Sequence, residues 1–288
     1  LTVLSFLSPR APSPGVGGFN RPAASSADPG KGASHTCDYP NVKKSDWHAY
    51  KDFAQNKDGT IQSTWRGYLL QSPKNNILID TGMLPVPYDH TYKKGMFLQN
   101  LKKAGVLPEE INYVFITHTH GDHIGNNIIW RNNKPLLNFP NAKYLVSKFD
   151  FDHYVDNQND EFIEQVLPLK ELSVLSLISG KFFIEENIWT LPTNGHTPGH
   201  QCLFVNIDDN NKLVFTGDLF HNEAQITENF WCPIFDWDTN MSTISRTGLF
   251  NLAFKNDWVV CTGHLEDKKA VGKIISRNGI LLWDPIQQ

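Results

Sequence analysis

The sequence predicts an α/β protein with mixed β-sheets, and three observations support this class. Short apolar runs that favour β-strands recur along the chain, as in Tyr113–Ile116 and Ala142–Val146. Segments with helical spacing lie between them, such as Met96–Leu101, which Gly105 closes. The 288 residues, 40% of them hydrophobic, suffice for one large domain with a buried core.

The remaining elements are assigned in chain order. Strands are predicted at Arg66–Gln71, Ile77–Asp80, Ile188–Leu191, Cys202–Ile207, Lys212–Thr216 and Trp258–Cys261. Helices are predicted from about Lys148, over Glu161–Leu167, and over Thr239–Phe254 with Asp238 as the N-cap. A C-terminal hairpin is predicted from Lys273–Ser276 and Ile280–Trp283, which flank the turn Asn278-Gly279.

The first forty residues differ in composition from the rest of the chain. They are rich in Pro, Gly, Ala and Ser, and such a segment buries too little apolar surface to offset its conformational entropy. We therefore expect a flexible extension over residues 1–40 and a single domain over residues 41–288. The opening Leu1–Ser8 lacks the basic start of a signal peptide, which favours a cytoplasmic location slightly over a secreted or periplasmic one without fixing the compartment.

Charge and hydropathy exclude two classes of partner. The chain has 26 Lys and Arg against 30 Asp and Glu, so the net charge of −4 provides no broad cationic surface for nucleic acid. The longest apolar runs, such as Gly279–Trp283, fall far short of the ~18 residues that a membrane span needs. The sequence predicts a soluble globular protein that binds neither nucleic acid nor membrane.

A dense group of metal-ligand side chains follows the strand at Tyr113–Ile116. His118, His120, Asp122 and His123 lie within six residues. In an extended segment, residues two apart point to the same side, so His118 and His120 can hold one ion together. Burying these groups so close together would destabilise the fold without a compensating cation.

Three further positions repeat the pattern of a strand, a small residue and a ligand-type side chain. They are His196 in Gly-His-Thr-Pro-Gly-His, Asp218 after Thr216-Gly217, and His264 after Thr262-Gly263. Together with the His118 cluster they make a ligand inventory for two ions.

Together with Asp80 in Ile-Asp-Thr-Gly, these residues make the sequence resemble the metallo-β-lactamase-fold hydrolases. The resemblance extends from about Trp65 to the C-terminus. The resemblance implies a four-layer αββα sandwich of two mixed β-sheets, with two zinc-type ions at one edge of the sheets. It implies that one ion is held by His118, His120 and His196, the other by Asp122, His123 and His264, with Asp218 bridging the two and Asp80 supporting the site by hydrogen bonds. The nitrogen and oxygen ligands suit Zn²⁺, and Co, Mn or Fe are alternatives.

Within this superfamily, the chain resembles most the branch of methyl parathion hydrolases and quorum-quenching lactonases. The segments Asn138–Ala142 and Gly217–His221 and the C-terminal hairpin carry this resemblance. Acyl-homoserine lactonases commonly have a tyrosine three residues after the bridging aspartate, where this chain has His221. This departure favours phosphotriesters over lactones, and homodimers are common in this branch.

The sequence therefore predicts a dinuclear zinc hydrolase that uses hydroxide between the ions to cleave a small ester-type substrate: a phosphotriester, a lactone or an aryl ester. Asp122 is expected to orient the attacking water, and His221 to donate a proton or hydrogen bond to the substrate. Apolar walls of the substrate pocket are expected from Met83, Leu84, Phe230, Trp231 and Phe235.

Two alternatives remain open at this stage. A thioester hydrolase resembling glyoxalase II shares most of the metal motif, but it predicts a C-terminal helical domain where this chain has a short hairpin after His264. A non-catalytic, metal-stabilised binding protein on the same fold is disfavoured by the complete ligand set.

Overall fold

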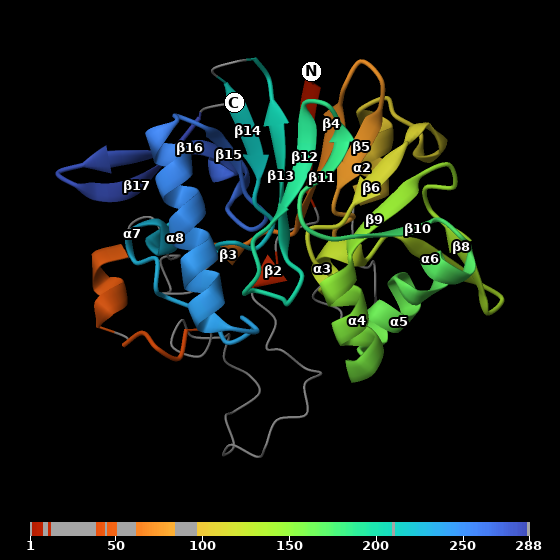
Figure 1. Ribbon diagram of the computed structural model, residues 1–288, viewed down its shortest axis with the longest axis horizontal. Helices are drawn as coiled ribbons and strands as arrows, with labels where there is room; N and C mark the ends of the chain where they lie inside the picture. The colour runs from red at the N-terminus through yellow and green to blue at the C-terminus, as the bar shows by residue number, and fades with distance from the viewer. Residues whose placement is uncertain are drawn as a thin grey trace.

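The computed structural model describes residues 2–7, 11–12, 39–43, 45–50, 62–83, 97–208 and 211–286. Within these residues two large β-sheets pack face to face, with helices on both outer faces, which gives four layers (Figure 1). The described strands of the first sheet lie in the order β1 (Thr2–Leu7), β4 (Arg66–Gln71), β5 (Asn76–Ile79), β6 (Tyr113–Phe115), β9 (Lys143–Ser147) and β10 (Leu175–Ile178). Those of the second sheet follow chain order: β11 (Phe182–Glu185), β12 (Ile188–Pro192), β13 (Gln201–Asn206), β14 (Lys212–Phe215), β15 (Val259–Cys261), β16 (Val271–Arg277) and β17 (Ile280–Pro285).

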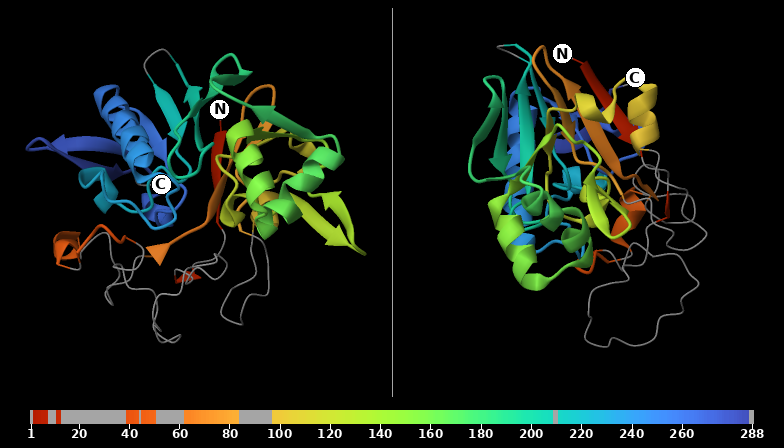
Figure 2. Two further views of the ribbon diagram at one scale, coloured as in Figure 1. Left: turned by 60° about the horizontal axis from the view of Figure 1, so that its bottom comes forward. Right: turned by 90° about the vertical axis from the view of Figure 1, so that its right-hand side faces the viewer.

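Helices close the sandwich on either side. The outer face of the first sheet carries α2 (Phe97–Lys103), α3 (Gly121–Ile124), α4 (Lys148–Asn157), α5 (Asp160–Gln165) and α6 (Leu167–Glu171), and that of the second carries α7 (Ala224–Thr227) and α8 (Thr239–Lys255). The left view of Figure 2 shows blue α8 on one side and the green helices on the other. Two small strand pairs lie outside these sheets: β2 (Ala11–Pro12) with β3 (Gln62–Ser63), and β7 (Ile128–Arg131) with β8 (Lys134–Leu137). The described residues also form the 3₁₀ turns η1 (Asp46–Tyr50), η2 (Pro108–Glu110) and η3 (Asp267–Lys269).

Alternation along the central strands explains the layers. In β5, Leu78 joins the apolar cluster beneath the helices, whereas Ile77 and Ile79 join the cluster between the sheets. In β14, Phe215 faces the other sheet and Val214 packs in the cluster with α8. Because both faces of these strands are covered, their sequences are continuously apolar. The predicted α/β class with mixed sheets is confirmed.

Helix α8 closely matches its predicted span. The side chain of Asp238 accepts hydrogen bonds from the backbone N–H groups of Asn240 and Met241, as expected of an N-cap. Leu249 and Phe250 are buried against the second sheet. The predicted hairpin is also present, with Asn278 and Gly279 both at positive φ, the conformation that a two-residue type I′ turn requires.

The start of the chain differs from the flexible extension expected over residues 1–40. Thr2–Leu7 form β1, which pairs antiparallel with β4 at the edge of the first sheet (Figure 2, right). The run Thr-Val-Leu-Ser-Phe-Leu is rich in β-prone residues, and β4 offers it unpaired backbone groups at the sheet edge. Most other residues of that segment lie outside the described ranges, so the domain boundary at residue 41 stays a prediction.

Parallel pairing brings the functional loops to one edge. β5 runs parallel to β6 and β14 runs parallel to β15. The residues that follow these four strands therefore emerge at carboxyl-terminal strand ends. They include Asp80, His118, Asp218 and His264. In the described part of the chain, no helix combines the length and apolar character needed to cross a membrane.

Candidate metal centre

Three histidine nitrogens converge after β6 and β12. His118 and His120 follow β6 in an extended segment, and His118 Nε2 lies 3.1 Å from His120 Nδ1. His196, on the loop between β12 and β13, places its Nε2 3.2 Å from His118 Nε2 and 3.0 Å from His120 Nδ1. A tetrahedral Zn²⁺ with Zn–N distances of about 2.0–2.1 Å holds its ligand nitrogens about 3.3 Å apart. This trio therefore has the spacing of ligands around one small cation.

A second group lies beside the first. It contains Asp122 and His123 from α3, Asp218 after β14 and His264 after β15, and their ligand atoms all lie within 4.8 Å of one another. His264 Nε2 lies 2.8 Å from Asp218 Oδ2, and His123 Nε2 lies 3.0 Å from Asp218 Oδ1. Asp122 Oδ2 lies 3.5 Å from both of these imidazole nitrogens.

Asp218 joins the two groups. Its Oδ2 lies 3.3 Å from His196 Nε2 and 3.7 Å from His118 Nε2, in addition to its contact with His264. Asp218 Oδ1 and His123 Nε2 are both buried, and their 3.0 Å contact lacks the geometry of a hydrogen bond. Neither atom is hydrogen-bonded to another described residue. Buried polar atoms that are not hydrogen-bonded are costly, and cations on either side of Asp218 would satisfy them. The residues present therefore fit a pair of metal ions.

The charges of the cluster also fit cations. Burial lowers the pKa of His118 well below its usual range and that of His120 to about 3, so both rings are neutral and have a lone pair to share. Burial opposes the ionised form of Asp218, but His123 and His264 outweigh it and hold its pKa well below the usual value. Against the same penalty, Asp218 and Asp122 raise the pKa of His123 well above 6.5. Without metal, protons on histidine supply the positive charge that the carboxylates require.

Asp80 supports His123 from behind. Its Oδ2 lies 2.8 Å from His123 Nδ1, and its two oxygens accept hydrogen bonds from the backbone N–H and the hydroxyl of Thr117, each at 2.8 Å. Asp80 itself has a positive φ of 58° directly after β5. This turn directs the carboxylate at the segment that carries the histidines.

The comparisons with known proteins agree with this geometry. The model of the metallo-β-lactamase superfamily matches residues 67–264, more than half of the chain. The chain belongs to the metallo-β-lactamase superfamily. An N-acyl homoserine lactonase of Bacillus cereus is 26% identical over 219 residues, which cover 70% of this chain and 82% of the relative. The metallo-beta-lactamase domain-containing protein 1 of Xenopus laevis is 28% identical over 199 residues, 68% of each chain.

Solved structures of this superfamily share the fold. The hydrolase AbOPH superposes with a TM-score of 0.79 at 21% identity, covering 99% of this chain and 94% of that one. AidC, a dizinc quorum-quenching lactonase, superposes with a TM-score of 0.74 at 22% identity, covering 88% and 90%. The predicted superfamily and the predicted hydrolase class are confirmed.

Several residues around the centre were not anticipated from the sequence. Asp236 Oδ1 lies 2.9 Å from His196 Nδ1, and His200 Nε2 accepts a hydrogen bond from the backbone N–H of Asp218 at 3.1 Å. Asp150, on α4, is fully buried and accepts hydrogen bonds from Thr119 N (3.2 Å), Thr197 Oγ1 (3.0 Å) and Gly199 N (2.6 Å). It thereby ties the loop of His118 to the loop of His196. The second histidine of the Gly-His-Thr-Pro-Gly-His run was a visible signal for His200, whereas Asp150 and Asp236 lie in no motif.

His221 and Phe235 lie against the centre. His221 Nε2 lies 3.2 Å from Asp218 Oδ2, and its ring stacks on His264 with centroids 5.0 Å apart. The ring of Phe235 lies 4.8 Å from that of His221 and 5.8 Å from that of His196. Phe235 thus contacts two histidine rings of the centre, and its role in an apolar wall of the substrate pocket stays a prediction.

The other expected wall residues differ. Trp231 is buried, with its ring centroid 4.7 Å from that of Trp47 and 5.3 Å from that of Tyr50. It therefore belongs to an aromatic cluster with these two residues and does not line an open pocket as expected. Phe230 is 54% exposed, and Met83 is half-buried with its carbonyl accepting from an asparagine side chain. Leu84 lies outside the described residues.

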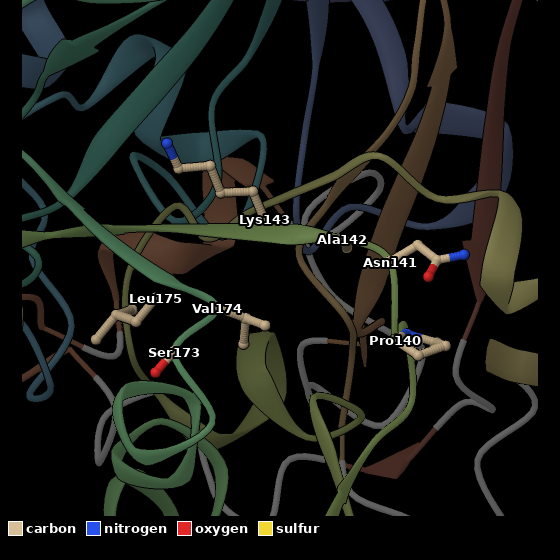
Figure 3. A pocket seen from close by; sticks show the side chains of 7 residues that line it. All are labelled: Pro140, Asn141, Ala142, Lys143, Ser173, Val174 and Leu175. Atoms are coloured by element: carbon tan, nitrogen blue, oxygen red, sulfur yellow. The ribbon is translucent and has the colours of Figure 1, made fainter.

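A separate pocket lies far from this centre. It is lined by residues around the start of β9 and β10, among them Asn141, Lys143 and Ser173 (Figure 3). Since β9 runs parallel to β6, the start of β9 lies at the end of the sheet opposite to His118. The pocket contains none of the metal-type residues.

Proposed function

We propose that this chain is a dinuclear zinc-dependent hydrolase that cleaves an ester-type bond in a small molecule, with lactones and phosphotriesters as the substrate classes. The observation that carries the proposal is the position of Asp218, whose two oxygens face both groups of ligands. His118, His120 and His196 would hold one ion and Asp122, His123 and His264 the other, with Asp218 shared. The name of the Bacillus cereus relative, a lactonase, supports the lactone class.

Such a pair of cations, when bound, lowers the pKa of a water molecule between them and polarises the carbonyl or phosphoryl oxygen of the substrate. The protein supplies a rigid frame for this chemistry. The Asp218 side chain is 4% exposed, and the histidine side chains around it are buried to a similar degree. Their positions are fixed by contacts behind them, so the ligands are arranged before substrate arrives.

Asp122 is partly open to solvent, with its side chain 18% exposed. A carboxylate oxygen there can accept a hydrogen bond from the attacking water and orient it. We assign this role to Asp122, in addition to its role as a ligand.

His221 lies beside Asp218, with 9% of its side chain exposed. Burial lowers its pKa to about 4, so the ring is neutral and carries one N–H. Its Nδ1 is buried and makes no hydrogen bond to any described residue, while Nε2 faces Asp218. We assign His221 the donation of a hydrogen bond to an oxygen of the substrate, beside the apolar ring of Phe235.

A substrate panel with metal analysis tests the proposal. Zinc-loaded protein should contain two ions per chain and hydrolyse a lactone or a phosphotriester, and a chelator should abolish turnover until zinc is restored. The matched variants are Asp122→Asn, which should lower turnover strongly, and Asp152→Asn on the exposed face of α4, which should not. Turnover that survives complete metal removal would refute the mechanism. Preferred cleavage of a thioester would assign the chain to the glyoxalase-II-like class, and no cleavage of any ester, lactone or phosphotriester would refute the enzyme activity proposed here.

A further inference from the structure

We propose that Asp236 and Arg246 form a positioning pair that fixes the ring of His196 and so sets the affinity of the ion held by His118, His120 and His196. This inference rests on the proposed function, because it requires that metal binds at that trio.

Asp236 is the only described side chain for which a contact with His196 Nδ1 is recorded. The two atoms are 2.9 Å apart, and the Asp236 side chain is fully buried. If His196 Nδ1 donates its proton to this carboxylate, Nε2 carries the lone pair. Nε2 is the atom that faces His118 and His120 at 3.2 and 3.0 Å. Asp236 therefore selects the form of the ring that can bind a cation in this position.

Arg246 holds Asp236 in place from α8. Its side chain is fully buried, and its Nη2 lies 3.5 Å from Asp236 Oδ2. The guanidinium also donates to four oxygen acceptors, Leu219 O at 2.7 Å, Asn229 O at 2.7 Å, Trp231 O at 2.9 Å and Ser242 Oγ at 3.0 Å, and it contacts Cys232 Sγ at 3.8 Å. These acceptors and Asp236 can use all five N–H groups of an arginine. A guanidinium satisfied in this way is rigid, and the carboxylate beside it has little freedom to turn.

The same guanidinium also connects to the second loop of the centre. Leu219, whose carbonyl accepts from Arg246 Nε, directly follows Asp218 in the chain. One buried arginine thus fixes both the carboxylate behind His196 and the backbone next to the shared Asp218.

The arrangement repeats in the other group of ligands. There, His123 Nδ1 faces the carboxylate of Asp80 at 2.8 Å. By contrast, the outer nitrogens of His118 and His264 face neutral oxygens, Thr117 Oγ1 at 3.1 Å and Thr64 O at 3.0 Å. Each group therefore contains one histidine backed by a carboxylate, which predicts that Asp236 and Asp80 act on different ions. Removal of such a carboxylate typically costs 10–100-fold in metal affinity.

The test compares D236N with D238N in the full chain. Asp238 lies two residues away on the same loop and caps α8 without contacting any histidine, so its variant reports the general cost of disturbing the loop. Zinc affinity is measured by competition with a chromophoric chelator, and the coordination by the visible absorption of the Co²⁺-substituted protein. Urea unfolding in excess chelator shows whether each variant folds, and D80N provides the reciprocal case.

We expect the wild type to bind two ions. D236N should weaken one of them 10–100-fold and change one component of the Co²⁺ spectrum, D80N should weaken the other, and D238N should weaken neither. Wild-type affinity and spectrum in folded D236N would overturn the pair, and so would equal weakening of both ions in D236N and D238N. If the wild type binds fewer than two ions, the dinuclear function fails, while an unchanged affinity in D236N would separately overturn the role of the pair.

Discussion

The substitution Gly195→Ala should separate the loop of His196 from the start of α8. Gly195 has a φ of +138°, a conformation that L side chains rarely adopt. A Cβ built at this position would lie 2.1 Å from Ser242 N and 2.3 Å from Ser242 Cα. Both of these are backbone atoms of the first turn of α8, and Ser242 N is already hydrogen-bonded to Asp238 O at 2.9 Å. Either the loop or the helix must therefore move.

The magnitude follows from two costs. Forcing a side chain into a strained backbone conformation costs about 1–3 kcal/mol, and overpacking a close contact costs about 1–3 kcal/mol more. We expect the free energy of unfolding of G195A to fall by about 2–6 kcal/mol. Because His196 is the next residue, the shift should also weaken zinc binding at the trio.

The assay is urea unfolding followed by circular dichroism in excess chelator, with Gly248→Ala as the control. Gly248 lies on the exposed face of the same helix, and a Cβ there would meet no atom within 4 Å. Alanine is the better helix former by about 0.5–1 kcal/mol, so G248A should unfold at a higher urea concentration than the wild type. Unfolding of G195A at the wild-type midpoint, with unchanged zinc affinity, would show that the close contact does not constrain the loop.

The remaining predictions concern the buried carboxylate of Asp150, the aromatic cluster around Trp231, pH and metal removal. Asp150→Ala should lower the free energy of unfolding by about 2–4 kcal/mol, since it leaves buried donors unsatisfied, whereas Asp152→Ala on the exposed face should change it by less than about 1 kcal/mol. Equal midpoints in urea would count against the role of Asp150 in joining the two loops. Burial raises the pKa of Asp150 from 3.8 to about 6. Between these pH values the folded state binds more protons than the unfolded state, so the contribution of Asp150 to the free energy of unfolding should decline as pH rises from about 4 to about 6. If the free energy of unfolding of D150N had the same pH dependence as that of the wild type, this would be contradicted. Trp231→Ala should cost about 3–5 kcal/mol of stability in the metal-free protein and Phe230→Ala little, as thermal unfolding of both would show, and the reverse order would disprove the burial of Trp231. Chelation should lower the melting temperature, since an ion at a thousand times its dissociation constant stabilises the folded state by about 4 kcal/mol, and an unchanged melting temperature would argue against metal binding in the folded state.

Elements with strong local signals were predictable from the sequence. The predicted strand Arg66–Gln71 coincides with β4, and the predicted helix Thr239–Phe254 differs from α8 by one residue at its end. The strand is a short apolar run followed by a polar turn, and the helix begins at the N-cap Asp238, so local and tertiary preferences agree. The ligand-type residues were found because strand ends carry them next to glycines, and the structure brings all seven of them together.

The parts that escaped prediction depend on contacts between distant segments. Asp236 lies 40 residues from His196 in the chain, and the two loops are joined by backbone hydrogen bonds from Trp237 N to His196 O at 3.0 Å and from Asp238 N to Gly195 O at 2.9 Å. Asp150 reaches a loop 49 residues away at Gly199, and its carboxylate on a helix reads as a solvent-exposed group in the sequence. The β7–β8 hairpin was missed although Asn132-Asn133, both at positive φ, is a turn signal of its own.

The central claim is that two cations share the carboxylate of Asp218, and anomalous diffraction at the zinc edge from crystals of the zinc-loaded protein tests it most directly. We predict two anomalous peaks, one among His118, His120 and His196 and one among Asp122, His123 and His264, each within coordination distance of an Asp218 oxygen. A single peak, or an Asp218 side chain turned away from both groups, would contradict the account.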